Sequence, residues 1–171
     1  GLKNFIVDAT ERPIRRPKDK TKQQHYYSGK KKQHTIKNQL LVHPQTRKIL
    51  AVSETVEGKR HDKQLMEDDP LIQKFPPHAT GMGDSAYLKS QELHPWLTMI
   101  IPEKKPPKGE LTDTQKANNR EISKIRVRAE HPIAYLKHFN ILAHKFRSDL
   151  DYAHQPFQTI AAVYNFTRNC Q

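Results

Sequence analysis

In the first half of the chain, hydrophobic residues form short runs or alternate with polar residues, and both patterns predict β-strands. An apolar run, Phe5–Val7, ends at Asp8 and predicts a buried strand. Residues 32–43 and 47–56 alternate in polarity and meet at a short turn-like segment, so we expect an antiparallel hairpin. Two shorter runs predict further strands at 79–83 and 97–101.

A period of three to four residues predicts helices in three other segments. The first covers about 62–72, and the last has its apolar positions between residues 157 and 164. The longest begins at Thr112, because Thr112 and Gln115 fit a capping box, and its apolar stripe continues beyond residue 136. Strands therefore come mostly first and helices interleave with the later ones.

Pro132 lies inside the longest predicted helix. Proline has no backbone N–H, and its ring clashes with the carbonyl of the residue four positions earlier, here Arg128. We therefore expect a kink at this point, or a second helix that begins at Pro132.

The order of these elements predicts an α/β or α+β fold in which helices pack a sheet. No internal repeat or linker divides the chain, so we expect one domain over residues 1–171. No apolar run is long enough to cross a membrane, and no secretory signal is evident. The lone cysteine, Cys170, favours a reducing, cytoplasmic setting.

Net charge is the strongest compositional signal. Thirty Lys and Arg residues against eighteen Asp and Glu residues give a formal net charge of +12. This balance favours a polyanionic partner, most often nucleic acid, and the alternative is a basic protein without that role.

Three acidic residues stand apart from the other carboxylates. Asp8 and Asp84 end predicted strands, and Glu130 lies beside the apolar stripe of the long helix. Carboxylates in such places can meet at one sheet edge, and Mg²⁺ prefers hard oxygen ligands. From spacing alone, structural roles stay open: Asp8 could form a turn and Asp84 a cap. Glu130 could pair with Arg126 one helical turn away.

Another acidic residue, Asp62, follows His61 at the start of the helix predicted at 62–72. Adjacent side chains at a helix start do not face each other, so a shared metal is disfavoured. Asp62 is instead expected to stabilise the first helical turn. For His131, substrate contact and a helix boundary stay equally open.

Five segments together resemble the catalytic domain of bacterial insertion-sequence DDE transposases. They are VDATERPIRRP, YYSGKKKQHTIKNQLLV, ILAVSETVEGKRHDKQL, GDSAY and RVRAEHPIAYLKHFNILAHKFR. The resemblance extends from about residue 5 to residue 168. It implies a ribonuclease-H-like α/β fold, a mixed sheet flanked by helices. It also implies two divalent ions, Mg²⁺ or Mn²⁺, DNA cleavage at the transposon ends, and strand transfer of the 3′-hydroxyl into target DNA.

Carried over residue by residue, the resemblance gives catalytic and metal-binding roles to Asp8, Asp84 and Glu130. Asp8 would contact both ions, and each of the other two carboxylates would contact one. Arg126 and Lys137 match the family's basic residues on either side of the glutamate. We expect both to neutralise charge on DNA phosphates.

Two positions depart from the family pattern. Ser123 stands where a tyrosine is often found, so the phosphate contact of that tyrosine is not expected here. Ala86 stands where glycine is usual, so a backbone angle that only glycine adopts is not needed there.

Basic residues outside this motif gather before residue 33. Segment 12–24 is rich in proline and in like charges, which predicts an extended loop. Tyr26 and Tyr27 follow it, and aromatic rings among cations favour a surface that tracks phosphates over a solvated loop. The residues expected to contact DNA are Arg12, Arg15, Arg16, Lys30, Lys31, Lys32, Arg126 and Lys137.

We therefore expect the catalytic domain of a metal-dependent DNA transposase. Two alternatives stay open: an inactive, DNA-binding remnant of a transposase, and a ribonuclease-H-like nuclease of other purpose. The expected partner is double-stranded DNA at transposon ends and target, in the bacterial cytoplasm at the nucleoid, and a homodimer on DNA is left open. Nothing in the sequence resembles the N-terminal helix-turn-helix region that such transposases commonly carry.

Overall fold

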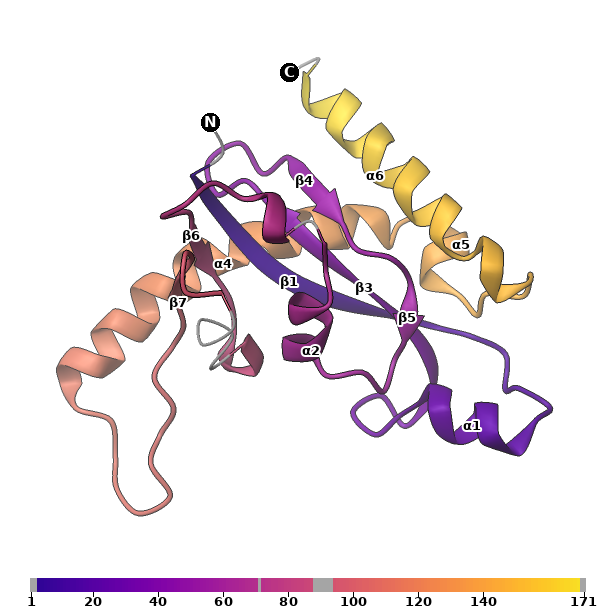
Figure 1. The fold of residues 1–171 in the computed structure, drawn as a ribbon, viewed down its shortest axis with the longest axis horizontal. Coiled ribbons are helices and arrows are strands. Elements are labelled where there is room, and N and C mark those ends of the chain that lie inside the picture. Colours follow the sequence, from indigo (N-terminus) through magenta and orange to yellow (C-terminus); the bar gives the residue numbers. More distant parts are fainter. Residues whose placement is uncertain (1–2, 71, 88–93, 170–171) are drawn as a thin grey trace.

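The computed structural model describes residues 3–70, 72–87 and 94–169, and a twisted sheet forms its centre (Figure 1). The strands are β1 (Asn4–Pro13), β2 (Tyr27–Ser28), β3 (Gln33–Val42), β4 (Ile49–Val52), β5 (Val56–Glu57), β6 (Thr80–Met82) and β7 (Thr98–Ile100). The α-helices are α1 (Lys20–Tyr26), α2 (Asp62–Glu67), α4 (Asp113–Leu136), α5 (Asn140–Ala143) and α6 (His154–Asn169). Short 3-10 helices are η1 (Ile72–Lys74), η2 (Ser85–Tyr87) and η3 (Leu150–Tyr152).

The sheet is mixed, with β1 at its centre. Its strand order is β2-β3-β1-β6-β7, and β4 and β5 also pair with β3. β1 runs antiparallel to β3 and parallel to β6, where Ile6 lies opposite Met82. The antiparallel pairing of β3 with β4 confirms the expected hairpin. A mixed sheet flanked by helices confirms the expected α/β class and is compatible with a ribonuclease-H-like fold.

Alternation along β1 fills one core on each side of the sheet. Phe5 and Val7 belong to a buried cluster that includes Met66 of α2. Ile6 belongs to the opposite cluster, which α4 and α6 complete. Successive side chains of a strand point to opposite faces, so Asp8 lies on the same side of the sheet as Ile6, the side that α4 covers. The two cores therefore hold β1 rigidly just before Asp8.

The segment after β1 corrects one expectation. β1 extends to Pro13, and α1 begins at Lys20, where the sequence predicted an extended loop. The carboxylate of Asp19 caps this helix, since its Oδ1 accepts a hydrogen bond from the backbone N–H of Lys22 at 2.8 Å. Asp19 is one of many charged residues in this segment. The charge density of the segment favoured the prediction of a loop, so the helix cap was not predicted.

The helix expected at about 62–72 is also shorter than predicted. α2 ends at Glu67, and the backbone continues into η1 after Pro70. Proline disfavours helical angles at the residue before it, which explains the early end. The helix expected near the C-terminus is confirmed, since α6 buries Phe157, Ile160, Ala161 and Tyr164.

Arg12 lies in the interior of the fold rather than on its surface. Its side chain is 1% exposed, and Nη2 donates to Asn38 Oδ1 at 2.8 Å and to the carbonyl of Ala153 at 3.0 Å. The guanidinium also stacks 4.8 Å from the ring centre of Phe157, and burial lowers the pKa of Arg12 to about 10. Arg12 therefore joins β1 and β3 to α6, and its burial removes it from the expected DNA contacts.

α4 continues through Pro132. The helix runs unbroken from Asp113 to Leu136, so the alternative of a second helix beginning at Pro132 is wrong. The capping box is confirmed, because Thr112 Oγ1 accepts the N–H of Gln115 at 3.2 Å and the Gln115 side chain accepts the N–H of Thr112 at 2.8 Å. Packing explains the tolerated proline, since Pro132 is buried among the residues that join α4 to the sheet.

No helix within the described ranges is long and apolar enough to span a membrane. Cys170, on which the expectation of a reducing setting depended, lies outside those ranges.

Replacing Pro132 with alanine is expected to raise the free energy of unfolding by about 1–2 kcal/mol. The change restores a helical N–H and removes the proline penalty of about 3 kcal/mol. The loss of the packing of the buried proline ring offsets part of this gain. Ser123→Ala, at an exposed position of the same helix, should change stability by no more than about 0.5 kcal/mol. Urea unfolding measures both, and a Pro132→Ala protein no more stable than the parent would contradict this account.

Candidate active site

The parallel pairing of β1 with β6 aligns two aspartates. Ile6 lies opposite Met82, and Asp8 and Asp84 each follow two residues later. Both side chains are half-buried. The negative charge of Asp84 raises the pKa of Asp8, so the two carboxylates lie within electrostatic reach of each other. The sheet therefore brings together two acids that are far apart in the sequence.

Burial is the main influence on Asp8 and raises its pKa above the usual 3.8. The backbone N–H of Ala9 donates to Asp8 Oδ1 at 2.8 Å, and this bond together with the charge of Arg126 lowers the pKa. The charges of Asp84 and Asp62 raise it. The net effect is a raised pKa, so the fold disfavours the ionised form of Asp8. A cation bound beside the carboxylate would stabilise that form.

Asp84 is fixed by a tight turn at the start of η2. Its Oδ1 accepts the backbone N–H of Ala86 at 2.7 Å, and its carbonyl accepts that of Tyr87 at 3.1 Å. The preceding Gly83 is needed because an added Cβ would lie 2.8 Å from Tyr87 Cδ2 and 3.1 Å from Val7 Cγ1. Ala86 is not among the described residues with positive φ, which confirms that glycine is not required there.

Arg126 of α4 and Lys137, the residue just after the end of that helix, are two cations near the same region. Arg126 is close enough to lower the pKa of Asp8. Burial and the charge of Lys31 lower the pKa of Lys137, while Asp8 and Glu11 act in the opposite direction. Both basic residues expected from the sequence therefore lie within electrostatic reach of Asp8.

Glu130 lies on α4, one turn after Arg126, with an exposed side chain. No ion pair among the described residues joins it to Arg126, and its charge is not among those that shift the pKa of Asp8. Within the described chain, no three Asp, Glu, His or Cys side chains are arranged to hold one metal ion. The structure therefore brings Asp8 and Asp84 together and leaves Glu130 outside their cluster.

Asp62 is an additional acid near the two aspartates. It begins α2, as expected, and its Oδ1 also accepts a 2.7 Å hydrogen bond from the ammonium of Lys37, which is nearly buried on β3. Its charge raises the pKa of Asp8, which places it within electrostatic reach. In the sequence, Asp62 stands beside His61. That Asp62 lies close to Asp8 is evident only from the folded sheet.

Tyr87 is the other residue that sequence reasoning missed. Its ring is 1% exposed, and its hydroxyl has no hydrogen-bond partner among the described residues. Burial raises the pKa of Tyr87 well above its usual value, and the charges of Asp62, Asp8 and Asp84 raise it further. A buried hydroxyl without a partner is costly, and this one lies within electrostatic reach of the three carboxylates. The only sequence signal for this residue was its place as the aromatic residue of the GDSAY segment.

The chemistry of these donors fits a divalent cation. Asp8 and Asp84 offer hard carboxylate oxygens, and their mutual repulsion would be relieved by Mg²⁺ or Mn²⁺ between them. Asp62 is less available, because Lys37 already neutralises it.

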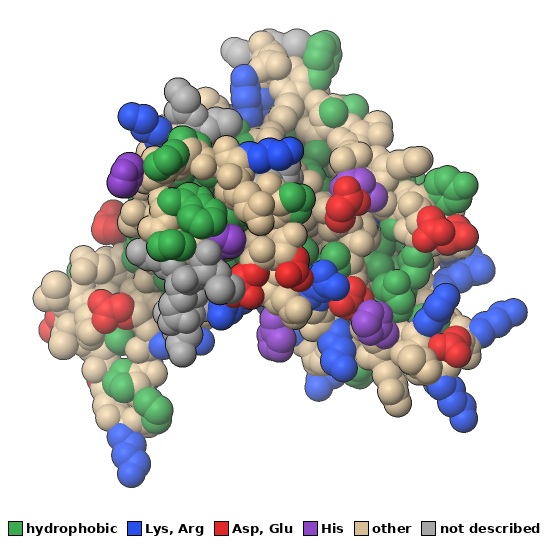
Figure 2. Space-filling view, viewed as in Figure 1, with side chains coloured by type: hydrophobic (Ala, Val, Ile, Leu, Met, Phe, Trp, Pro, Cys, Tyr) green, Lys and Arg blue, Asp and Glu red, His purple; other side chains and the backbone are tan. Residues whose placement is uncertain are grey.

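The other expected DNA contacts are exposed. They are Arg15, Arg16, Lys30, Lys31 and Lys32. Lysine and arginine side chains project from the α1 end of the molecule, at the lower right of Figure 2. Gln23 fixes the guanidinium of Arg16 through bonds of 3.1 and 2.8 Å to its Oε1. Lys30 lines a cavity that also reaches Asp62, so cations border the path to the carboxylates.

Comparisons with known proteins agree with this arrangement of acids. The sequence profile of the DDE superfamily endonucleases matches residues 7–165. A probable transposase for insertion sequence element IS702 of Microchaete diplosiphon is 33% identical over 165 residues, which is 94% of this chain and 56% of that protein. The chain thus spans just over half the length of this relative. No solved structure matches the chain.

The matched region includes most of β1 and all of β6 and α4, and it includes Asp8, Asp84 and Glu130. Because the match covers nearly the whole chain and the fold aligns the two aspartates, the chain belongs to the DDE superfamily of endonucleases.

Proposed function

We propose that this chain is the catalytic domain of an insertion-sequence DNA transposase. It would cleave phosphodiester bonds at the ends of the element and transfer the freed 3′-hydroxyl into target DNA. The observation that carries the proposal is the register of β1 with β6, which aligns Asp8 and Asp84 near the two cations. The family and the similar IS702 transposase support the same reaction class.

Asp8, Asp84 and Glu130 would hold two divalent cations, with Asp8 contacting both. When bound, such ions neutralise charge on the scissile phosphate and activate the attacking oxygen. Glu130 is exposed and lies between two residues whose charges reach Asp8. We propose that its side chain turns toward Asp8 in the loaded enzyme, which completes the set of three carboxylates.

Arg126 and Lys137 would act on the DNA rather than on the cations. Both lie close enough to Asp8 for the charges to interact, so a phosphate held beside Asp8 would lie within reach of their charges. Their positive charges would stabilise the additional negative charge that develops on the phosphate during transfer. The formal net charge of +12 favours double-stranded DNA as the substrate.

Asp84→Asn is expected to abolish Mg²⁺-dependent nicking of a duplex that carries the element's terminal repeat, a loss of at least about a hundredfold. The amide keeps the turn with Ala86 but removes the charge needed to hold a cation. Glu130→Gln should cause a comparable loss. Gel analysis of end-labelled DNA measures both.

Asp113→Asn is the matched control, because that carboxylate is fully exposed at the start of α4 and should leave nicking unchanged. Full activity of Asp84→Asn would contradict the assignment. Absence of nicking by the parent protein would favour the inactive DNA-binding remnant. Nicking without joining of 3′-ends to target DNA would favour a nuclease of other purpose.

The raised pKa of Asp8 makes a prediction about stability without metal. The folded protein holds this proton more tightly than the unfolded chain, whose aspartate has a pKa of 3.8. The stabilising contribution is present below the unfolded pKa and is lost as pH rises through the folded pKa. Asp8→Asn stays neutral throughout, so at neutral pH it should be more stable than the parent protein in EDTA.

Thermal unfolding at a series of pH values measures this difference, which should shrink as the pH falls through the folded pKa of Asp8 and disappear below 3.8. Asp113→Asn, at an exposed position, should show no such pH-dependent gain. A parent protein as stable as Asp8→Asn at neutral pH would contradict the electrostatic account of the site.

A further inference from the structure

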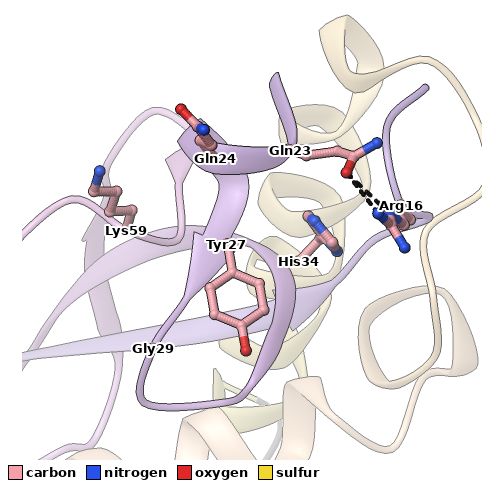
Figure 3. Close-up of a pocket in the computed structure, with 7 residues that line it drawn as sticks. All are labelled: Arg16, Gln23, Gln24, Tyr27, Gly29, His34 and Lys59. Carbon is pink, nitrogen blue, oxygen red and sulfur yellow. Dashed lines mark hydrogen bonds between the residues drawn. The ribbon is translucent and has the colours of Figure 1, made fainter. Parts of the chain in front are cut away.

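Two cavities that share lining residues extend from the α1 end of the molecule toward the candidate active site, and we call the pair the groove. One cavity, of about 730 Å³, is lined by residues of α1 and β3, by Arg16 before α1, by Tyr27 of β2 and by Lys59 of the loop before α2 (Figure 3). A second cavity, of about 360 Å³, shares Gly29 and Lys59 with the first. The second cavity extends to Asp62 and Ala86, which border the carboxylates.

Tyr27 presents an aromatic ring in the wider part of this groove. Its side chain is 42% exposed, although it begins β2 and pairs with His34 of β3. The two rings meet edge to face, with centres 5.6 Å apart and planes at 73°. This contact fixes the orientation of the tyrosine ring, which lines the cavity together with His34, both drawn in Figure 3.

Arg16 is held in place on the same cavity. Gln23 Oε1 accepts two hydrogen bonds from its guanidinium, and the Gln23 side chain donates in turn to the carbonyl of Pro17 at 2.8 Å. A fixed guanidinium binds an anion with less loss of side-chain entropy than a free one.

Cations continue along the narrower part of the groove. Lys30 and Lys59 are exposed, and no ion pair within the described residues engages either of them. Lys37 and Arg60 are already paired, with Asp62 and Glu57 respectively. The unpaired charges therefore lie where a chain of phosphates would run from Arg16 toward the carboxylates.

We propose that this groove binds the single-stranded end of a DNA strand next to the cleavage point, with an unpaired nucleobase stacked on Tyr27. Arg16, Lys30 and Lys59 would contact the phosphates on either side of that base. An exposed aromatic ring among fixed and free cations matches the chemistry of single-stranded DNA, whose bases offer flat faces that a paired duplex conceals. This inference rests on the proposed DNA cleavage and adds which part of the DNA is held.

The test compares two probes without divalent ions, so that no cleavage occurs. One is a blunt duplex, and the other carries a short single-stranded overhang with the fluorescent base 2-aminopurine. Wild-type protein should bind the overhang duplex more tightly and quench its fluorescence. Tyr27→Ala should weaken overhang binding about tenfold and leave blunt-duplex binding nearly unchanged. Tyr27→Phe keeps the ring and should behave as wild type.

Tyr152→Ala is the matched control, because this tyrosine is 59% exposed and does not line either cavity. Lys59→Gln should weaken binding of both probes and reduce the slope of log affinity against log salt by about one. Circular dichroism establishes that each variant is folded.

If Tyr27→Ala binds each probe as tightly as wild type does, the stacking proposal is overturned. It is also overturned if Tyr27→Ala loses the same affinity for the overhang duplex as for the blunt duplex. A Tyr27→Phe protein that loses the overhang preference would also overturn it, because the ring remains. Cleavage is measured separately with Mg²⁺. Wild-type protein that nicks DNA but shows no overhang preference contradicts only this inference, whereas protein that never nicks contradicts the proposed function.

Discussion

The parallel pairing of β1 with β6 is the constraint on which the rest of the site depends. It sets Asp8 and Asp84 at equivalent positions beyond the aligned Ile6 and Met82, and both cores of the protein support it. Gly83 leaves room for Tyr87 and Val7 of the same core, because an added Cβ at this position would press against both side chains. A shift of one residue in this register would move one carboxylate to the opposite face of the sheet and separate the pair.

Placing carboxylates in this way has an energetic cost. Asp8 is disfavoured as an anion by burial and by two neighbouring acids, and the buried hydroxyl of Tyr87 has no hydrogen-bond partner in the part of the chain that the structure describes. The packing of β1 supplies the stability that sustains such a site, since local conflicts of this kind persist where the surroundings enforce them. Arg126 relieves part of the repulsion around Asp8, and a bound cation would relieve more.

Local patterns were sufficient to predict much of the fold. The alternation in β3 and β4, the cap at Thr112 and the apolar stripe of α6 depend on neighbouring residues, and all of them are confirmed. The interior place of Arg12 could not be predicted, because its partners, which are Asn38 of β3, Ala153, and Phe157 of α6, lie far along the chain. The proximity of Asp62 and Tyr87 to Asp8 likewise results from sheet order, which periodicity does not encode.

The central claim is that Asp8, Asp84 and Glu130 act together on divalent cations. Anomalous diffraction from crystals soaked in Mn²⁺ tests it most directly, because manganese peaks are located independently of any assumption about the site. The account predicts two peaks in contact with the carboxylates of Asp8 and Asp84, with the side chain of Glu130 turned inward to contact one of them. Manganese bound elsewhere, or peaks at the aspartates with Glu130 still directed into solvent, would contradict it.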